Sequence, residues 1–138
     1  MTPDAWPLRC LLVDDNAGFL RSARLLLEGE GIAVVAVAST GDEALREAEA
    51  LVPDVVLVDI DLGGESGFDV VGRLHGRPSG APSDVILIST HAEDDFADLI
   101  AATPVAGFIS KSHLCARSIH RLLGREDGDP PPNELRGP

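Results

Sequence analysis

The chain has 138 residues, of which 44% are hydrophobic, and this is enough for one domain with a substantial core. Its formal net charge of −12 should repel phosphate backbones and anionic lipids, so we expect no direct binding of nucleic acid or membrane. No apolar run is long enough to cross a bilayer, and Met1 to Arg9 lack the apolar stretch of a signal peptide. We therefore expect a cytoplasmic protein.

Short apolar runs alternate with amphipathic stretches along the chain. Runs of aliphatic, largely β-branched residues are typical of buried strands, whereas apolar residues three and four positions apart are typical of helices. In chain order, the predicted elements are a strand at 8–13, a helix at 17–28, a strand at 32–38, a helix capped by Ser39 or Thr40 and ending at 51, a strand at 55–59, a helix at 68–74, a strand at 85–89, a helix at 93–102, a strand at 105–109 and a helix at 112–123.

The first and last helices have apolar faces that should pack on the sheet. The predicted inner residues of these two helices are Phe19, Ala23, Leu26, Leu27, Cys115, Ile119, Leu122 and Leu123.

The cysteines and histidines have simple interpretations. Cys10 and Cys115 should be reduced, mostly apolar side chains. The four histidines match no metal-binding spacing and are predicted to be solvated at the surface: His75, His91, His113 and His120.

Strict alternation of strands and helices predicts a doubly wound α/β sandwich. Parallel strands need crossover connections, and these are right-handed almost without exception. Residues 1–124 therefore form one domain with a five-stranded parallel sheet between helices. Residues 125–138 are acidic and proline-rich, so we expect a disordered tail.

Oxygen-bearing side chains and one ammonium group follow the predicted strands. Asp14 and Asp15 end the first strand, Asp59 ends the third, Ser89 ends the fourth and Lys111 follows the fifth. In an open parallel sheet the carboxyl ends of the strands are where ligands bind. The sequence thus predicts one site that combines three carboxylates, a hydroxyl and an ammonium group.

These residue types suit a hard divalent cation and a phosphoryl group. Mg²⁺ prefers anionic oxygen ligands, and the clustered carboxylates of Asp14, Asp15 and Asp59 would be relieved of mutual repulsion by a cation. Asp59 could act as the nucleophile toward a phosphoryl donor. Lys111 and Mg²⁺ would neutralise charge on the phosphoryl oxygens, and the Ser89 hydroxyl could bond to one of them. Two plainer interpretations stay open, namely an N-cap at Asp14-Asp15 and a surface lysine at position 111.

The same residues carry a resemblance to a known family. From about residue 8 to residue 124, the chain resembles the receiver domain of bacterial two-component response regulators, with the spacing of the motifs preserved. The matching segments are Val13-Asp14-Asp15-Asn16, Asp59-Ile60-Asp61-Leu62, Gly67-Phe68, Ser89-Thr90 and Gly107-Phe108-Ile109-Ser110-Lys111.

The resemblance implies a fold and a set of residue roles. The fold would be the flavodoxin-like sheet of CheY-like receivers, with strand order 2-1-3-4-5. Asp59 would be the phosphoacceptor, and Mg²⁺ would be bound by Asp14, Asp15, Asp59 and the backbone carbonyl of Asp61. Lys111 would bind the phosphate, Ser89 would be the switch hydroxyl and Phe108 the switch aromatic residue.

It also implies a mechanism and partners. A histidine kinase or phosphotransfer protein would pass its phosphoryl group to Asp59. Ser89 and Phe108 would then move, changing the surface of the fourth helix, fifth strand and fifth helix. Such a domain is not an enzyme in the ordinary sense, because it catalyses only its own phosphoryl transfer and dephosphorylation. The signal would pass to a downstream protein or to an output domain missing from this chain. A second copy of the chain, in a homodimer, is a further expected partner.

The chain departs from many receivers at two positions. Gly63-Gly64 stands where many have a proline, which predicts a looser loop around Asp61. Ser112 follows Lys111 where many receivers also have proline, so a cis Lys-Pro bond is absent. Lys111-Ser112 and Phe108 make the chain most similar to receivers joined to LuxR-type DNA-binding domains.

Other functional classes remain open from the sequence alone. Asp59-Ile60-Asp61 after an apolar strand also resembles the nucleophile motif of haloacid-dehalogenase-like phosphatases, which turn over many equivalents of substrate. The acidic pair precedes Asp59 rather than following Lys111, which argues against that class. A second alternative is a pseudo-receiver that only docks partners. A flavodoxin-like FMN site is disfavoured because Asp14 and Asp15 would repel the phosphate.

Overall fold

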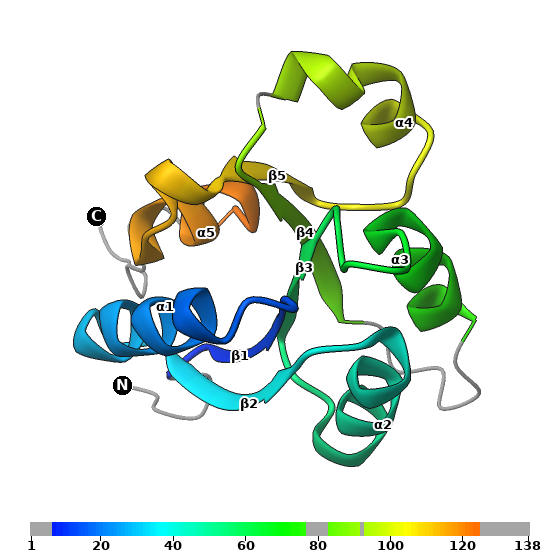
Figure 1. The fold of residues 1–138 in the computed structure, drawn as a ribbon. Helices are drawn as coiled ribbons and strands as arrows, with labels where there is room; N and C mark the ends of the chain where they lie inside the picture. Colours follow the sequence, from blue (N-terminus) through cyan, green and yellow to red (C-terminus); the bar gives the residue numbers. More distant parts are fainter. Residues whose placement is uncertain (1–6, 77–82, 92, 125–138) are drawn as a thin grey trace.

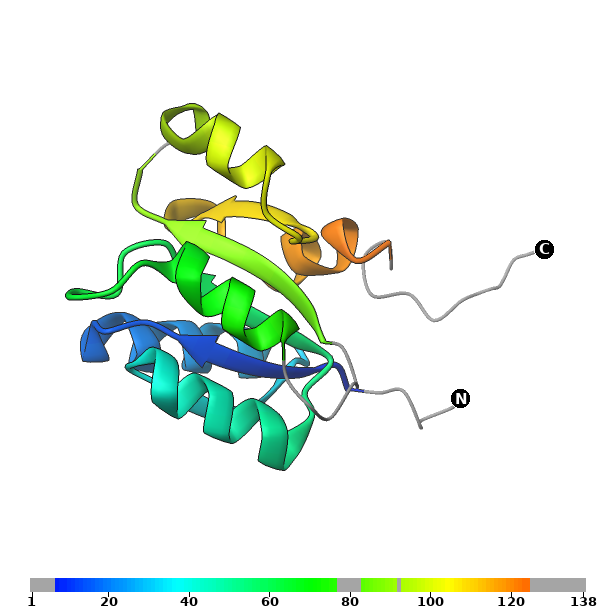
Figure 2. The same ribbon diagram turned by 90° about the vertical axis from the view of Figure 1, so that its right-hand side faces the viewer.

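The computed structural model describes residues 7–76, 83–91 and 93–124, which form a central parallel sheet covered by helices on both faces (Figure 1). The sheet order is β2-β1-β3-β4-β5, and this confirms the predicted fold class. The strands are β1 (Arg9–Val13), β2 (Ala33–Ala38), β3 (Val55–Asp59), β4 (Asp84–Ser89) and β5 (Gly107–Ser110). All neighbouring strands are parallel, so their carboxyl ends share one edge, toward which the arrowheads point in Figure 2.

Helices lie on both sides of the sheet. The helical elements are α1 (Ala17–Gly29), α2 (Gly41–Leu51), α3 (Gly67–His75), the 3₁₀ turn η2 (Glu93–Phe96), α4 (Ala97–Ala101), the 3₁₀ turn η3 (Lys111–His113) and α5 (Ala116–Leu122). Figure 1 shows α1 and α5 on one face of the sheet, and α2, α3 and α4 on the other.

The core consists of two apolar layers, one on each face of the sheet. On β3, Leu57 packs with α1 and α5, whereas its neighbours Val56 and Val58 pack with α2 and α3. All three side chains are fully buried. Burial on both faces explains why the strands read as continuous aliphatic runs rather than as alternating apolar and polar residues.

The inner face of α1 differs from the predicted one. Leu20, Ala23 and Leu27 are buried, whereas Leu26 is 43% exposed. The prediction of an inward Leu26 was therefore wrong, and Leu20 takes the inner position instead. The adjacent leucines of this helix make several apolar stripes equally plausible, and the actual packing against β1 selects one of them.

The predicted helix at 112–123 begins later than expected. Lys111–His113 forms η3, and α5 starts at Ala116, whose N–H donates to Glu30 Oε1 at 2.7 Å. Burial of Leu114 between these elements interrupts the helical path. The prediction of solvated histidines was wrong for His120, which is buried in α5 at 4% exposure.

The predicted helix at 93–102 is divided into η2 and the short α4. None of the residues of α4 is fully buried, so little packing favours regular helix there.

Cys10 and Cys115 are free thiols. Residues 77–82 and the predicted tail at 125–138 lie outside the described residues. Within the described ranges, no helix has the length and apolarity needed to span a membrane.

Candidate functional site

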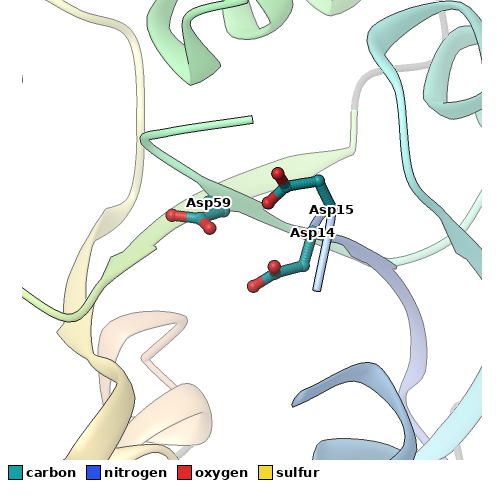
Figure 3. A group of neighbouring side chains, drawn as sticks. All are labelled: Asp14, Asp15 and Asp59. Carbon is teal, nitrogen blue, oxygen red and sulfur yellow. The ribbon is translucent and has the colours of Figure 1, made fainter. Parts of the chain in front are cut away.

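Three carboxylates meet at the carboxyl edge of the sheet. Asp14 and Asp15 directly follow β1, and Asp59 is the last residue of the neighbouring strand β3. One oxygen from each carboxylate lies within 4.8 Å of the others, and Figure 3 shows the three groups projecting from adjacent strand ends. Asp14 is fully buried and Asp59 is 6% exposed, whereas Asp15 is exposed.

Lys111 brings a positive charge into this acidic group. Its Nζ lies 2.6 Å from Asp14 Oδ2 and 3.1 Å from Asp59 Oδ2, and the Lys111 side chain is only 14% exposed. Burial disfavours the ammonium form, but the contacts with Asp14 and Asp59 outweigh it and raise the pKa of Lys111 above its ordinary value. Lys111 therefore lies inside the site as a cation and not on an open surface.

Asp59 carries a charge that the fold compensates only in part. Burial raises the pKa of Asp59 above its ordinary value, and the nearby charge of Asp14 raises it further. The Asp61 N–H, which donates to Asp59 Oδ1 at 3.1 Å, and the Lys111 ammonium lower the pKa without offsetting the rise completely. A further cation at the carboxylates would favour the ionised form of Asp59.

The plainer interpretation of Asp14-Asp15 as a helix cap was wrong. Asn16 caps α1, since its Oδ1 accepts the Phe19 N–H at 2.9 Å. Asp14 Oδ1 accepts the Asn16 N–H at 2.9 Å. Asp14 Oδ2 is buried and, among the described residues, accepts no hydrogen bond of good geometry. It has only the close ammonium of Lys111 beside it, so this oxygen suits a cation.

The loop between β3 and α3, which contains two glycines, forms hydrogen bonds within itself and to the start of α2. Asp61 Oδ1 accepts the Gly63 N–H at 3.1 Å, and Glu65 Oε1 accepts the N–H of Gly41 at 2.7 Å. Gly63 has a φ of +75°, and a Cβ there would lie 3.0 Å from Asp15 Oδ2. The exposed Asp61 carboxylate is thus bonded within its own loop, and its backbone carbonyl as a metal ligand stays a prediction.

The predicted switch residues lie on the strands beside Asp59. Ser89 ends β4 and is buried, and its Oγ accepts the His91 N–H at 2.9 Å. The His91 ring lies edge-on to Phe96, with 5.9 Å between the ring centroids. Phe108 on β5 is partly buried in the core layer of α2 and α3. Ser89 is therefore linked through His91 to the start of the β4–α4 segment. The sequence had predicted His91 only as a solvated surface residue.

Sequence reasoning also missed a contact between Phe19 and Lys111. Phe19 was predicted only as a core residue of the first helix. In the structure its ring centroid lies 4.3 Å from Lys111 Nζ. No sequence motif joins these two residues, because the contact forms between the first turn of α1 and the start of η3, directly after β5. The apolar spacing of α1 predicted that the Phe19 ring faces inward, but it did not predict the contact with Lys111.

Comparison with known proteins identifies the family. The family model described as "Response regulator receiver domain" matches residues 10–122, so the chain belongs to the response regulator receiver domains, the signalling domains of two-component systems. The match confirms the resemblance noted in the sequence and favours a signalling domain over the phosphatase interpretation.

Individual relatives agree with this assignment. The response regulator GacA of Pseudomonas viridiflava is 32% identical over 117 residues, covering 83% of this chain and 53% of the relative. The nitrate/nitrite response regulator protein NarP of Escherichia coli is 36% identical over 102 residues, covering 72% of this chain and 46% of the relative. The chain thus spans about half the length of these curated relatives.

A solved structure shows the same fold. The signal receiver domain of the response regulator NarL from Mycobacterium tuberculosis superposes with a TM-score of 0.74 at 26% identity. The match covers 87% of this chain and 99% of the solved one. Similarity to NarP and NarL places the chain beside receivers of the LuxR/NarL type, as Lys111-Ser112 and Phe108 predicted.

Proposed function

We propose that the chain is a phosphorylatable receiver in which Asp59 accepts a phosphoryl group from a histidine kinase or phosphotransfer protein. The observation that carries the proposal is the setting of Asp59. Its carboxylate ends a buried strand, lies 3.1 Å from the Lys111 ammonium and shares a site with Asp14 and Asp15. A partly compensated carboxylate, a lysine and an acidic pair at the carboxyl edge of a parallel sheet are the groups that a phosphoryl site needs.

The transfer step assigned to Asp59 is a simple displacement. A carboxylate oxygen of Asp59 forms a bond to phosphorus while the bond between phosphorus and the donor histidine nitrogen breaks, and the released imidazole takes up a proton. Lys111 stabilises the negative charge on the phosphoryl oxygens. The buried Asp14 keeps Lys111 at the site through the 2.6 Å ion pair.

The carboxylates fit Mg²⁺. Asp14, Asp15 and Asp59 supply hard anionic oxygens within 4.8 Å of one another, and the buried Asp14 Oδ2 accepts no well-aligned hydrogen bond among the described residues. Asp61 would add its backbone carbonyl. When bound, the ion supplies positive charge that offsets the charge gathered by the phosphoryl group and the carboxylates.

Phosphorylation would act as a switch through Ser89 and Phe108. Ser89 Oγ gives up the bond in which it accepts the His91 N–H and donates its own O–H to a phosphoryl oxygen, and this moves the start of the β4–α4 segment. Phe108 turns inward, and the face of α4, β5 and α5 changes shape. This face would pass the signal to a downstream protein, to an output domain of a longer regulator or to a second copy of the chain.

Intact mass spectrometry after incubation with acetyl phosphate and Mg²⁺ tests the proposal. We expect one phosphoryl adduct per chain in the wild type and none in Asp59→Asn or after Mg²⁺ is removed with a chelator. More than one equivalent of phosphate released rapidly per chain would instead indicate a phosphatase. No adduct from acetyl phosphate or from a phosphorylated histidine kinase, in a folded chain, would support a pseudo-receiver that only docks partners.

A further inference from the structure

Three side chains contact the Lys111 ammonium, and one of them, Phe19, is not among the proposed phosphoryl-site residues. Asp14 and Asp59 contact the ammonium with carboxylate oxygens at 2.6 and 3.1 Å. The Phe19 ring lies beside the same ammonium, with 4.3 Å between Lys111 Nζ and the ring centroid. At this distance the electron-rich face of an aromatic ring attracts a cation.

The position of Phe19 is fixed by the start of α1. Its N–H donates to Asn16 Oδ1 at 2.9 Å, and Asn16 is the residue that follows the acidic pair. The Phe19 side chain is partly buried and packs against the core layer that α1 and α5 share. The ring is therefore anchored to the same strand end that supplies Asp14 and Asp15, so it can act as a fixed support.

We propose that Phe19 is a positioning residue that holds the Lys111 ammonium at the phosphoryl site. The inference rests on the proposed function of Asp59 as phosphoacceptor. A lysine side chain has many rotamers, and ordering it at one point has an entropic cost. A ring face lowers the energy of the ordered position and shields the ammonium from water, which fits the 14% exposure of the side chain.

The chemical character of the ring suits the transfer better than a third carboxylate would. An additional anion would compete with the incoming phosphoryl oxygens for Lys111 and would repel them. The ring attracts the ammonium more weakly and without a localised negative charge, so Lys111 can turn from Asp59 toward the phosphoryl group while it stays over Phe19. We therefore expect an aromatic residue at position 19 to support phosphorylation better than an aliphatic residue of similar size.

The test compares Phe19→Leu, which keeps an apolar side chain, with Phe19→Tyr, which keeps the ring face. At saturating Mg²⁺ we expect Phe19→Leu to lower the rate constant for phosphorylation by acetyl phosphate about threefold to tenfold. Phe19→Tyr should stay within about twofold of the wild type. The control is Leu123→Ala, which removes a partly buried side chain from the same core layer and should lower the melting temperature without changing this rate constant.

Two further readouts separate positioning from packing. In ¹H–¹³C spectra of the unphosphorylated chain, ring-current shielding should move the Lys111 ε-methylene protons upfield in the wild type and Phe19→Tyr but not in Phe19→Leu. In a Lys111→Met background, Phe19→Leu should have no additional effect on the rate, because its partner is absent.

The outcomes distinguish this inference from the proposed function. Normal phosphorylation of Phe19→Leu, or an equal loss in the Lys111→Met background, would overturn the positioning role and leave Asp59 as the acceptor. Absence of any Asp59-dependent adduct in the wild type would reject the proposed function, and the positioning role with it. A shielded Lys111 together with a slow Phe19→Leu and a normal Phe19→Tyr would establish the inference.

Discussion

The setting proposed to suit Asp59 for phosphoryl transfer should also lower the stability of the metal-free fold. Its side chain is 6% exposed, and burial makes the charged form costly even with the Asp61 N–H and the Lys111 ammonium beside it. A carboxylate in this state gains from any added positive charge, which is the property that a cation-dependent phosphoacceptor needs. For the same reason we expect the ionised Asp59 to destabilise the metal-free folded state.

Replacing Asp59 with asparagine should stabilise the metal-free protein at neutral pH. Because burial raises the pKa of Asp59 in the folded state, the folded chain binds more protons than the unfolded chain between the ordinary and the raised pKa. The free energy of unfolding of the wild type therefore falls as pH rises through that window. We expect Asp59→Asn to be more stable above it, on the order of 1 kcal/mol, a typical size for one substitution.

Urea unfolding in the presence of a chelator, at a series of pH values, measures this difference. The gain should shrink as pH falls through the raised pKa, where Asp59 becomes protonated and neutral in the wild type too. Asp84→Asn is a matched control, since Asp84 is exposed at the start of β4, on the opposite edge of the sheet. A lower stability of Asp59→Asn at neutral pH would show that the ion pair with Lys111 outweighs the cost of burial.

The elements around the site differ in how firmly they are anchored. α3 buries Val70, Val71 and Leu74, whereas α4 is one short turn with no fully buried residue and no side-chain cap at its start. Elements with few buried contacts cost least to move. α4 is therefore the helix of the proposed signalling face that can respond to a new bond at Ser89, while α3 keeps the phosphoryl site in place.

Gly67, the first residue of α3, brings the helix close to β3, which carries the proposed phosphoacceptor. A Cβ at this position would lie 2.1 Å from the Asp59 carbonyl oxygen and 2.9 Å from Ile60 Cα, and both are backbone atoms that cannot turn aside. We expect Gly67→Ala to lower the free energy of unfolding by about 3 kcal/mol and to slow phosphorylation, because the end of β3 must shift.

Gly72→Ala in the same helix is the matched control. A Cβ at Gly72 meets no atom within 4 Å, and alanine favours helix over glycine by about 1 kcal/mol. Urea unfolding should therefore show a more stable Gly72→Ala with a normal phosphorylation rate. If both variants changed stability in the same direction, close approach at Gly67 would not be the reason for glycine there.

At the scale of the whole molecule, the parallel topology explains what the sequence could predict. Once five aliphatic runs alternate with helices, the residues after each run must share one edge, and this is enough to assemble Asp14, Asp59 and Lys111. Contacts that depend on side-chain packing between distant elements could not be predicted. These contacts include the inward packing of Leu20, the contact of Phe19 with Lys111 and the burial of His120. Helical spacing predicts which way a side chain points, but it does not predict which residue of another element it will contact.

The late start of α5 has the same cause. A continuous helix from residue 112 satisfies local propensity, but burial of Leu114 and the bond between the Ala116 N–H and Glu30 favour a break. Glu30 lies in the turn after α1, far away in the sequence. The local sequence pattern therefore does not predict the start of a helix where two elements on the same face of the sheet meet. It predicts the strands better, because the hydrogen-bonded ladder between strands fixes their geometry.

The acidic character of the chain leads to a prediction about metal binding. With a formal net charge of −12 and three carboxylates whose oxygens lie within 4.8 Å of one another, the folded state should gain stability when Mg²⁺ binds. An ion that binds only the folded chain stabilises it by about 1.4 kcal/mol at ten times its dissociation constant. Urea unfolding at increasing Mg²⁺, at constant ionic strength, should show this increase, and a chelator should reverse it.

Asp15→Asn separates this specific binding from general screening of negative charge. Asp15 is exposed, so its substitution should leave the metal-free stability within about 0.5 kcal/mol while it removes one proposed ligand and most of the response to Mg²⁺. Asp84→Asn changes the net charge equally at the far edge of the sheet and should retain the full response. Equal responses in the two variants would mean that Mg²⁺ acts on the overall charge of the chain and not at the carboxylates beside Asp59.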